Sequence, residues 1–456
     1  MAYYISVTHE AKGLNKRGTI QVMKKDFLLQ RSVLPNGMRV LLYPIDHVES
    51  VYVRLDLRIG SSFENDTNHG ISHLIEHYLH QGNQLSQTSE DFALKLEENG
   101  IFQNGRTSSS SSDYYMKCPK DKFELALNEL HAMILRPLFP KDRLDHVKKT
   151  VLNEYYDYVR EPKNPFFEEF FNKRFTDKPP FMRNAIGTEG SIQDITLDQI
   201  QKFYKDYYFA GNFILTITGN FDTKKAQEKI ESLFHSSPVN TSIQFPKVEK
   251  GHYSSYLITT KHFESDQIQF SLTLPGYGWT DRPMREWQAL SLGTTILGSG
   301  RFSRLYRTLR EKNNLVYWVS SSSDYYQTRG LISINGSCTK ENLAKTLQLI
   351  IDEIHLIKEK GVTEKELETG KNIYIAGMTF GLETPEGIAG HLLHDEFWDQ
   401  PIMLPSEYIE LLRSIKVDEV NNELKILDTK NLNLALYGNL NKSEVTKTTN
   451  EIQKAI

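Results

Sequence analysis

The stretches Asn212-Phe-Ile-Leu-Thr-Ile-Thr-Gly-Asn-Phe221 and Asn431-Leu-Asn-Leu-Ala-Leu-Tyr-Gly-Asn-Leu440 decide the fold of this chain. In each, a short apolar run of strand length ends in Gly-Asn and leads into a polar, lysine-rich stretch with helical character. Upstream of them, Ile195–Ile200 and Ile415–Val420 also resemble one another, and the offset between the two copies is kept to within a single gap. A repeat this long predicts two copies of one domain, each of roughly 200 residues.

Both halves mix strand-like and helical patterns. Alternating runs such as Tyr52–Leu57 and Gln267–Leu274 lie among long stretches with helical periodicity. The predicted class is therefore α+β, with a first domain over 1–235, a turn-rich linker over 236–250 and a homologous second domain over 251–456. Chance resemblance between the halves is the alternative, and the matched order of two segments disfavours it.

The composition is that of a folded globular chain. Of the 456 residues, 39% are hydrophobic and 25% are charged, and the net charge of -4 argues against a broad electrostatic grip on nucleic acid. The two cysteines, Cys118 and Cys338, indicate a reducing compartment rather than a disulfide framework. Because no apolar run has the length of a signal peptide or a membrane span, the expected location is cytoplasmic, without a membrane partner.

Residues 69–80 read His-Gly-Ile-Ser-His-Leu-Ile-Glu-His-Tyr-Leu-His and have the period of an amphipathic helix. The apolar positions have the spacing of one buried helical face: Ile71, Leu74, Ile75, Tyr78 and Leu79. The polar positions share the other face: His73, Glu76, His77 and His80. Two imidazoles one turn apart can bind one metal ion, although such pairs also arise by chance among 14 histidines. The added glutamate makes the inverted zincin signature His-x-x-Glu-His.

A catalytic zinc ion needs a third protein ligand and one open position for water. The stretch 143–158 is a second helix candidate, with an apolar face made by Val147, Val151, Tyr155 and Tyr158. Glu154 is in phase with that face, where a carboxylate is costly unless it is paired or bound to metal. We therefore predict Glu154 as the third ligand. The alternatives are a buried salt bridge and a glutamate at the helix edge.

With these residues the chain resembles the pitrilysin/insulinase family of zinc peptidases, in its two-domain, processing-peptidase-like branch. In that family a glutamate ligand follows His-x-x-Glu-His at a characteristic distance along the chain, and Glu154 follows His77 at that distance here. Leu34–Val40 is similar to the family's opening strand, and Gly60–Glu64 to its approach to the zinc helix.

The resemblance implies a ligand set and a base. One Zn²⁺ per chain would be held by His73, His77 and Glu154, and Glu76 would be the catalytic base.

The resemblance also implies substrate contacts in the first half. Asn104-Gly105-Arg106-Thr107 stands where the family has Asn-Ala-x-Thr on a sheet edge whose backbone pairs with the substrate, a form of β-augmentation. All four residues are therefore predicted to bind substrate. The alternative is a turn that leads into a flexible serine loop at 108–112.

In the second half, Arg310 and Tyr317 follow the glycine-rich stretch Gly298–Tyr306, seven residues apart. Active family members have an arginine and a tyrosine at this spacing that reach the substrate carbonyls, so both residues are predicted to be catalytic. A guanidinium and a phenol suit a developing oxyanion. A surface arginine and a tyrosine at the start of a strand are the alternatives.

Two positions depart from the family pattern. Val147 stands where many members have a second glutamate, and His80 replaces an aromatic residue that commonly follows the zinc motif. Such changes tune the surroundings of a metal site. They leave the three ligands and the base unchanged.

The resemblance implies a zinc-dependent metalloendopeptidase that cleaves peptides or extended segments inside a closed chamber, with leader-peptide or presequence removal as one such role. The fold it implies is two homologous α/β sandwich domains, which form half of a clam-shell chamber. A full chamber then requires a homodimer or a heterodimer with a related chain. The alternatives are an inactive structural or partner subunit, and a protein with a purely structural metal.

Overall fold

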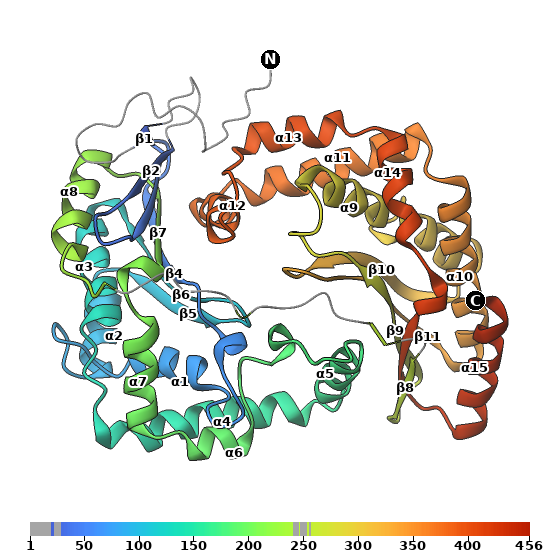
Figure 1. Ribbon diagram of the computed structural model, residues 1–456, viewed down its shortest axis with the longest axis horizontal. Coiled ribbons are helices and arrows are strands. Elements are labelled where there is room, and N and C mark those ends of the chain that lie inside the picture. Colours follow the sequence, from blue (N-terminus) through green and yellow to red (C-terminus); the bar gives the residue numbers. More distant parts are fainter. Residues whose placement is uncertain (1–19, 22–28, 240–245, 247–252, 255–256) are drawn as a thin grey trace. The chain divides into compact units, whose positions relative to one another are not determined.

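The computed structural model describes residues 20–21, 29–239, 246, 253–254 and 257–456 (Figure 1). The chain divides into two units. The first comprises Met1–Tyr158, Pro180–Lys247 and Phe380–Pro405, and the second Val159–Pro179, Val248–Thr379 and Ser406–Ile456. Most of the predicted linker, 236–250, lies outside the described residues. The domain limits drawn from the sequence, 1–235 and 251–456, stay a prediction.

The first unit is built on one mixed sheet. Within the described residues it has seven strands in the order β1-β2-β3-β7-β4-β6-β5. These are β1 (Ile20–Gln21), β2 (Gln30–Val33), β3 (Arg39–Pro44), β4 (Ser50–Leu57), β5 (Phe102–Thr107), β6 (Ser112–Pro119) and β7 (Phe213–Gly219). Strands β3 and β7 are parallel, and the pairs from β7 to β5 are antiparallel. Because β5 ends the order, its outer edge has no strand partner among the described residues.

Helices cover one face of this sheet, as Figure 1 shows for α1, α3 and α8. They are α1 (Ile71–Leu79), α2 (Ser89–Glu98), α3 (Phe123–Leu135), α4 (Leu144–Arg160), α6 (Glu189–Asp194), α7 (Leu197–Tyr207) and α8 (Thr223–Phe234). Alternate strand residues such as Val53 and Leu55 point into the core between the two layers. The apolar stripe predicted for residues 71–79 is buried in the same core.

A helix that lies late in the sequence covers the other face. Helix α12 (Pro385–Phe397) buries Leu393 and Phe397 against Leu41 and Ile214. The first unit is therefore a sandwich that needs a segment from the second half of the chain.

The second unit repeats this plan. Within the described residues its sheet has five strands in the order β10-β11-β9-β12-β8. These are β8 (Leu257–His262), β9 (Gln267–Gly276), β10 (Val316–Tyr325), β11 (Gly330–Thr339) and β12 (Asn433–Gly438). Strands β8 and β12 are parallel and the other pairs are antiparallel, so the order and directions are those of β5-β6-β4-β7-β3.

The helices of the second unit are α5 (Lys163–Lys173), α9 (Met284–Gly298), α10 (Leu343–Lys360), α11 (Glu364–Gly381), α13 (Pro405–Ser414), α14 (Val417–Glu423) and α15 (Lys442–Ala455). The core on one face of the sheet includes residues of α9, α10 and α15. On the other face Phe166 and Phe170 of α5 pack against Ala435 and Tyr437. Helix α5 lies early in the sequence, so each sheet is covered on one face by a helix from the opposite half of the chain.

The sequence repeat is a structural repeat. The Gly-Asn stretches that end β7 and β12 place Gly219 and Gly438 at φ +121° and +152°, a region that L side chains rarely adopt. Cys118 and Cys338 stand at corresponding positions of the two halves, on the matching strands β6 and β11, each as a buried free thiol. The predicted α+β class with two homologous domains is thereby confirmed.

In the described part of the chain, no helix combines the length and the apolar character that crossing a membrane requires.

Candidate active site

The site begins where helix α1 begins. Gly70, at φ +94°, precedes the helix, and the carboxylate of Glu64 accepts hydrogen bonds from the backbone N–H groups of Gly70 at 2.7 Å and Ser72 at 2.9 Å. An anionic group here accepts hydrogen bonds from backbone N–H groups that the first turn of a helix leaves unpaired. Its negative charge also interacts favourably with the positive end of the helix dipole. Glu64 thus fixes the start of the helix that carries the histidines. Its role was not predicted from the sequence, although an acidic residue shortly before a helix is a recognisable capping signal.

Three polar side chains of α1 come together, as predicted. His73, Glu76 and His77 form a group whose possible ligand atoms all lie within 4.8 Å of one another. The two Nε2 atoms of the histidines are 3.2 Å apart. Because the apolar face of α1 is fully buried, the direction of this polar face is fixed by the core.

Glu154 approaches the histidines from helix α4. Its Oε2 atom lies 3.5 Å from His73 Nε2 and 3.4 Å from His77 Nε2. The three atoms therefore form a nearly equilateral triangle with sides of 3.2, 3.4 and 3.5 Å. A tetrahedral zinc ion with bonds of about 2.0 to 2.1 Å holds its ligand atoms about 3.3 Å apart. The donor set and its spacing fit such an ion.

The burial predicted for Glu154 is wrong. Glu154 was predicted to lie on the buried face of its helix, but its side chain is 45% exposed, whereas Val147 and Val151 are buried. The position of Glu154 in the turn carries it to the rim of the apolar stripe, where solvent reaches the carboxylate. The contact with the histidines, not the cost of burial, is what identifies it as a ligand candidate.

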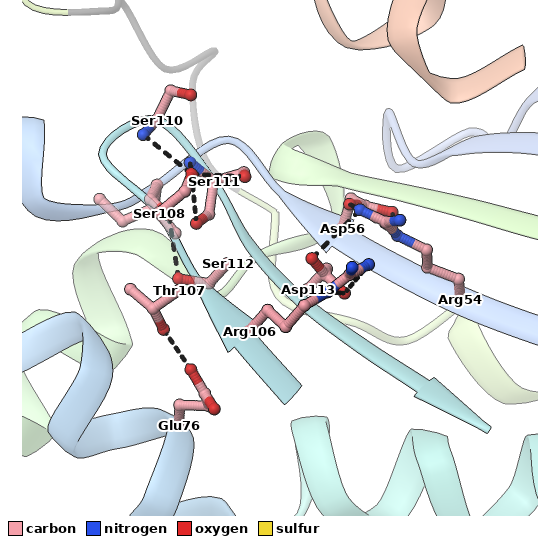
Figure 2. A network of polar contacts seen from close by, with 11 residues as sticks. Arg54, Asp56, Glu76, Arg106, Thr107, Ser108, Ser110, Ser111, Ser112 and Asp113 are labelled. Atoms are coloured by element: carbon pink, nitrogen blue, oxygen red, sulfur yellow. Dashed lines mark hydrogen bonds and ion pairs between the residues drawn. The ribbon is translucent and has the colours of Figure 1, made fainter. Parts of the chain in front are cut away.

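Glu76 lies between the histidine pair and the edge strand β5. Thr107 Oγ1 donates a hydrogen bond of 2.5 Å to Glu76 Oε2 (Figure 2). Gly105 leaves room for the same side chain, because a Cβ atom there would lie 2.8 Å from Glu76 Cγ. Glu76 is thus held by β5 while Glu154 completes the triangle with the histidines.

The pKa values of the two histidines and the two glutamates shift in different directions. Burial and the neighbouring His77 lower the pKa of His73 to about 4, which keeps its imidazole neutral, the form that binds metal. Burial also acts to lower the pKa of His77, but the hydrogen bond and charge of Glu154 outweigh it and raise that pKa. The hydrogen bond with His77 lowers the pKa of Glu154. Burial raises the pKa of Glu76, as suits a residue that must accept and return a proton.

His80 connects the helix to the edge strand. Its Nδ1 lies 2.9 Å from the carbonyl oxygen of Glu76, and its Nε2 lies 2.7 Å from Oε1 of Gln103 on β5. Both partner atoms are carbonyl oxygens, which only accept, so a neutral imidazole donates to one of them at a time. The sequence singled out His80 but gave no sign of Gln103, which is identified only by the fold.

The other departure from the family pattern is Val147. Val147 is 1% exposed and belongs to the apolar core. Nδ1 of His73 is buried and has no hydrogen-bond partner in the part of the chain that the structure describes. Metal-binding histidines commonly donate this second N–H to an acceptor.

The predicted substrate segment 104–107 lies on β5, the strand at the end of the sheet. The serines after it form a hydrogen-bonded turn, in which Ser108 Oγ accepts from the N–H groups of Ser110 and Ser111 (Figure 2). The backbone of this turn is also hydrogen-bonded to Ser61, whose N–H donates to the carbonyl oxygen of Ser108.

Arg310 and Tyr317 are brought together in the second unit. Arg310 lies in the π-helical segment Tyr306–Lys312 and donates to the carbonyl oxygen of Val316 at 2.7 Å. Its guanidinium lies 5.5 Å from the centre of the Tyr317 ring. The register of β10 shifts between Val316 and Trp318, and Tyr317 at this bulge is 74% exposed.

Two family descriptions match successive parts of the chain, and the boundary between them falls before the first copy of the repeat rather than between the two copies. Residues 39–187 match the family described as insulinase, peptidase family M16, and residues 194–374 match the peptidase M16 inactive domain. This chain belongs to the insulinase family M16. The predicted ligands and Glu76 all lie in the segment matched by the insulinase description, and none lies in the segment matched by the inactive domain.

Several relatives are similar to this chain over most of their length. An uncharacterized zinc protease of Rickettsia felis is 26% identical over 407 residues, which cover 88% of this chain and 94% of the relative. An uncharacterized zinc protease of Mycobacterium tuberculosis is 25% identical, with 90% and 93% covered.

Solved structures of other proteins share the fold. A peptidase M16 inactive domain from Pseudomonas fluorescens has a TM-score of 0.81 and 24% identity, covering 91% of this chain and 98% of that one. A protease from Helicobacter pylori has a TM-score of 0.79 and 19% identity, covering 90% and 99%.

Proposed function

We propose that this chain is a zinc-dependent endopeptidase that hydrolyses extended peptide segments. The observation that carries the proposal is the triangle of His73 Nε2, His77 Nε2 and Glu154 Oε2 beside a buried Glu76. A purely structural zinc site has four protein ligands and no need of an adjacent base.

The proposed chemistry assigns one task to each group. Bound by His73, His77 and Glu154, a zinc ion would acidify water and polarise the scissile carbonyl. Glu76 takes up the proton of the attacking water and delivers it to the leaving amine. The hydrogen bond from Thr107 keeps one oxygen of Glu76 on the β5 side.

We also propose that the peptide pairs with the outer edge of β5, as the family resemblance implies. That edge has no strand partner among the described residues, so it can add one strand. Main-chain pairing accepts many sequences, because the backbone bonds do not read side chains. Arg310 and Tyr317 are proposed to bind the substrate carbonyl.

The test is hydrolysis of a quenched peptide library by wild type and by Glu76→Gln. Wild type should cleave, and a zinc chelator should stop cleavage until zinc is restored. Glu76→Gln, which keeps the shape of the side chain but removes its basicity, should cleave at least a hundredfold more slowly. A wild-type protein that cleaves nothing contradicts the proposal and favours an inactive partner subunit. A Glu76→Gln variant as fast as wild type contradicts the assignment of Glu76 as the base.

The assembly is proposed on the family resemblance alone. We expect a homodimer or a heterodimer with a related two-domain chain, and light scattering during size exclusion measures it. A monomer that cleaves peptides at full rate would remove the reason for a second chain.

A further inference from the structure

The edge strand β5 has two different faces. Gln103 contacts His80, and Gly105 and Thr107 contact Glu76, so these alternate residues face helix α1. Arg106 lies between them in the sequence and therefore projects to the opposite face of the sheet. A peptide strand added beside β5 would present every second side chain to this face.

Arg106 is anchored on that face by its cross-strand neighbour. In the register of β5 and β6 it lies opposite Asp113, and its Nε and Nη2 atoms donate to Asp113 Oδ2 at 3.3 and 3.2 Å (Figure 2). Its guanidinium also lies 5.8 Å from the centre of the Tyr115 ring. The side chain is thus oriented by contacts within the sheet.

Asp113, which accepts the hydrogen bonds of Arg106, also accepts one from Arg54. Arg54 on β4 contacts the other oxygen of Asp113 at 3.1 Å and binds Asp56 more closely, at 2.6 to 3.1 Å. The network therefore contains two guanidinium groups and two carboxyl groups. It satisfies Arg106 only through two long bonds to one oxygen, and Nη1 of Arg106 has no hydrogen-bond partner among the described residues.

Exposure within the network is uneven. The side chains of Asp56, Asp113 and Arg54 are 1%, 6% and 14% exposed, whereas that of Arg106 is 58% exposed. A substrate side chain that reaches this network from solvent meets a cation with spare donors. Both carboxyl groups are covered and already paired.

We propose that Arg106 is a specificity-determining residue that selects a carboxylate side chain in the peptide strand paired with β5. This inference rests on the proposed function. Opposite charges on adjacent strands attract and like charges repel, so a glutamate beside Arg106 favours binding and a lysine opposes it. The preferred substrates then carry an acidic residue at one position near the cleaved bond. Arginine-rich leader segments of the transit-peptide type are disfavoured there.

The test uses pairs of quenched peptides that differ only in Glu or Lys at one position, scanned through the residues on both sides of the cleaved bond. At one position wild type should prefer Glu by about three- to tenfold in kcat/KM, as expected for a partly exposed charge pair. Arg106→Glu should reverse the preference and Arg106→Gln should abolish it. Lys120→Glu, an exposed charge reversal of the same size on the same unit, should leave it unchanged.

Thermal melting and zinc content establish that each variant is folded and loaded. A folded Arg106→Gln or Arg106→Glu variant that keeps the wild-type preference overturns the inference and leaves the proposed function intact. A wild-type preference for Lys at every position also overturns it. Failure of wild type to cleave any peptide overturns the proposed function, and the inference with it.

Discussion

Thr107 Oγ1 donates a hydrogen bond of 2.5 Å to Glu76 Oε2, and this bond joins the edge strand of the first sheet to the helix that carries the histidines. A carboxylate that must accept a proton works only in one position, and the hydroxyl holds it there.

Replacing Thr107 by Val removes this hydrogen bond and keeps the shape of the side chain. We expect kcat to fall about tenfold or more, since hydrogen bonds to charged groups contribute roughly 1.5 to 3 kcal/mol. KM and zinc content should change little, because Glu76 is not a predicted ligand. Thr107→Ser, which keeps the hydroxyl, should restore most of kcat. Equal kcat values for the Val and Ser variants would contradict a positioning role.

His80 and Gln103 should be coupled across the same helix and strand. Each of His80→Phe and Gln103→Leu should loosen β5, which hydrogen exchange of its backbone amides would detect. The double variant should cost less than the sum of the two, by about 1 kcal/mol of coupling free energy. Additive effects on the free energy of unfolding would show that the bond between Nε2 and Oε1 contributes nothing.

Arg310→Ala and Tyr317→Phe should each lower kcat/KM by about ten- to a thousandfold, as loss of an oxyanion donor does. Neither change should alter zinc content, since the predicted ligands all lie in the first unit. Arg307→Ala, an exposed position on the same π-helical segment, is the matched control. If Arg307→Ala and Arg310→Ala behave alike, Arg310 is a surface residue.

His131 of helix α3 should make the protein less stable in acid. Burial and the charge of Arg136 lower the pKa of His131 to about 4, below the unfolded value of about 6.5. As the pH falls from 6.5 to 4, His131 binds a proton in the unfolded chain but stays neutral in the folded protein. Between pH 7 and pH 5 wild type should therefore lose roughly 2 kcal/mol more stability than His131→Gln.

Urea unfolding at the two pH values measures this difference. The exposed His47 provides the control, and His47→Gln should follow wild type. A His131→Gln variant with the same acid sensitivity as wild type would rule out His131 as its source.

Local patterns predicted much of the fold. The repeated Gly-Asn stretches are the ends of β7 and β12, because the positive φ of Gly219 and Gly438 leaves a mark in the sequence. The spacing of the apolar residues in 71–79 predicted the buried face of α1, because residues at helical spacing lie on the same side of a helix. The exchange of α5 and α12 between sheets left no such mark, because an apolar helix face does not reveal which sheet it will meet.

The sequence predicted which side chains meet at the candidate site but not what surrounds them. The spacing from His77 identified Glu154, whereas the burial assumed for it was wrong, because periodicity cannot distinguish the centre of an apolar stripe from its rim. The hydrogen bond of Thr107 with Glu76 depends on the register between a strand and a helix that are far apart in sequence. Sequence spacing carries no information on such a pair.

The zinc content of three purified proteins tests the assignment of the metal ligands: wild type, Glu76→Gln and Glu154→Gln. We expect one zinc ion per chain in wild type and in Glu76→Gln, and loss of zinc in Glu154→Gln. Glu76 lies close enough to the histidines to be a ligand by distance, so the comparison decides between the two glutamates. Zinc retained by Glu154→Gln and lost from Glu76→Gln would overturn this assignment, because the residue assigned as base would then be the ligand.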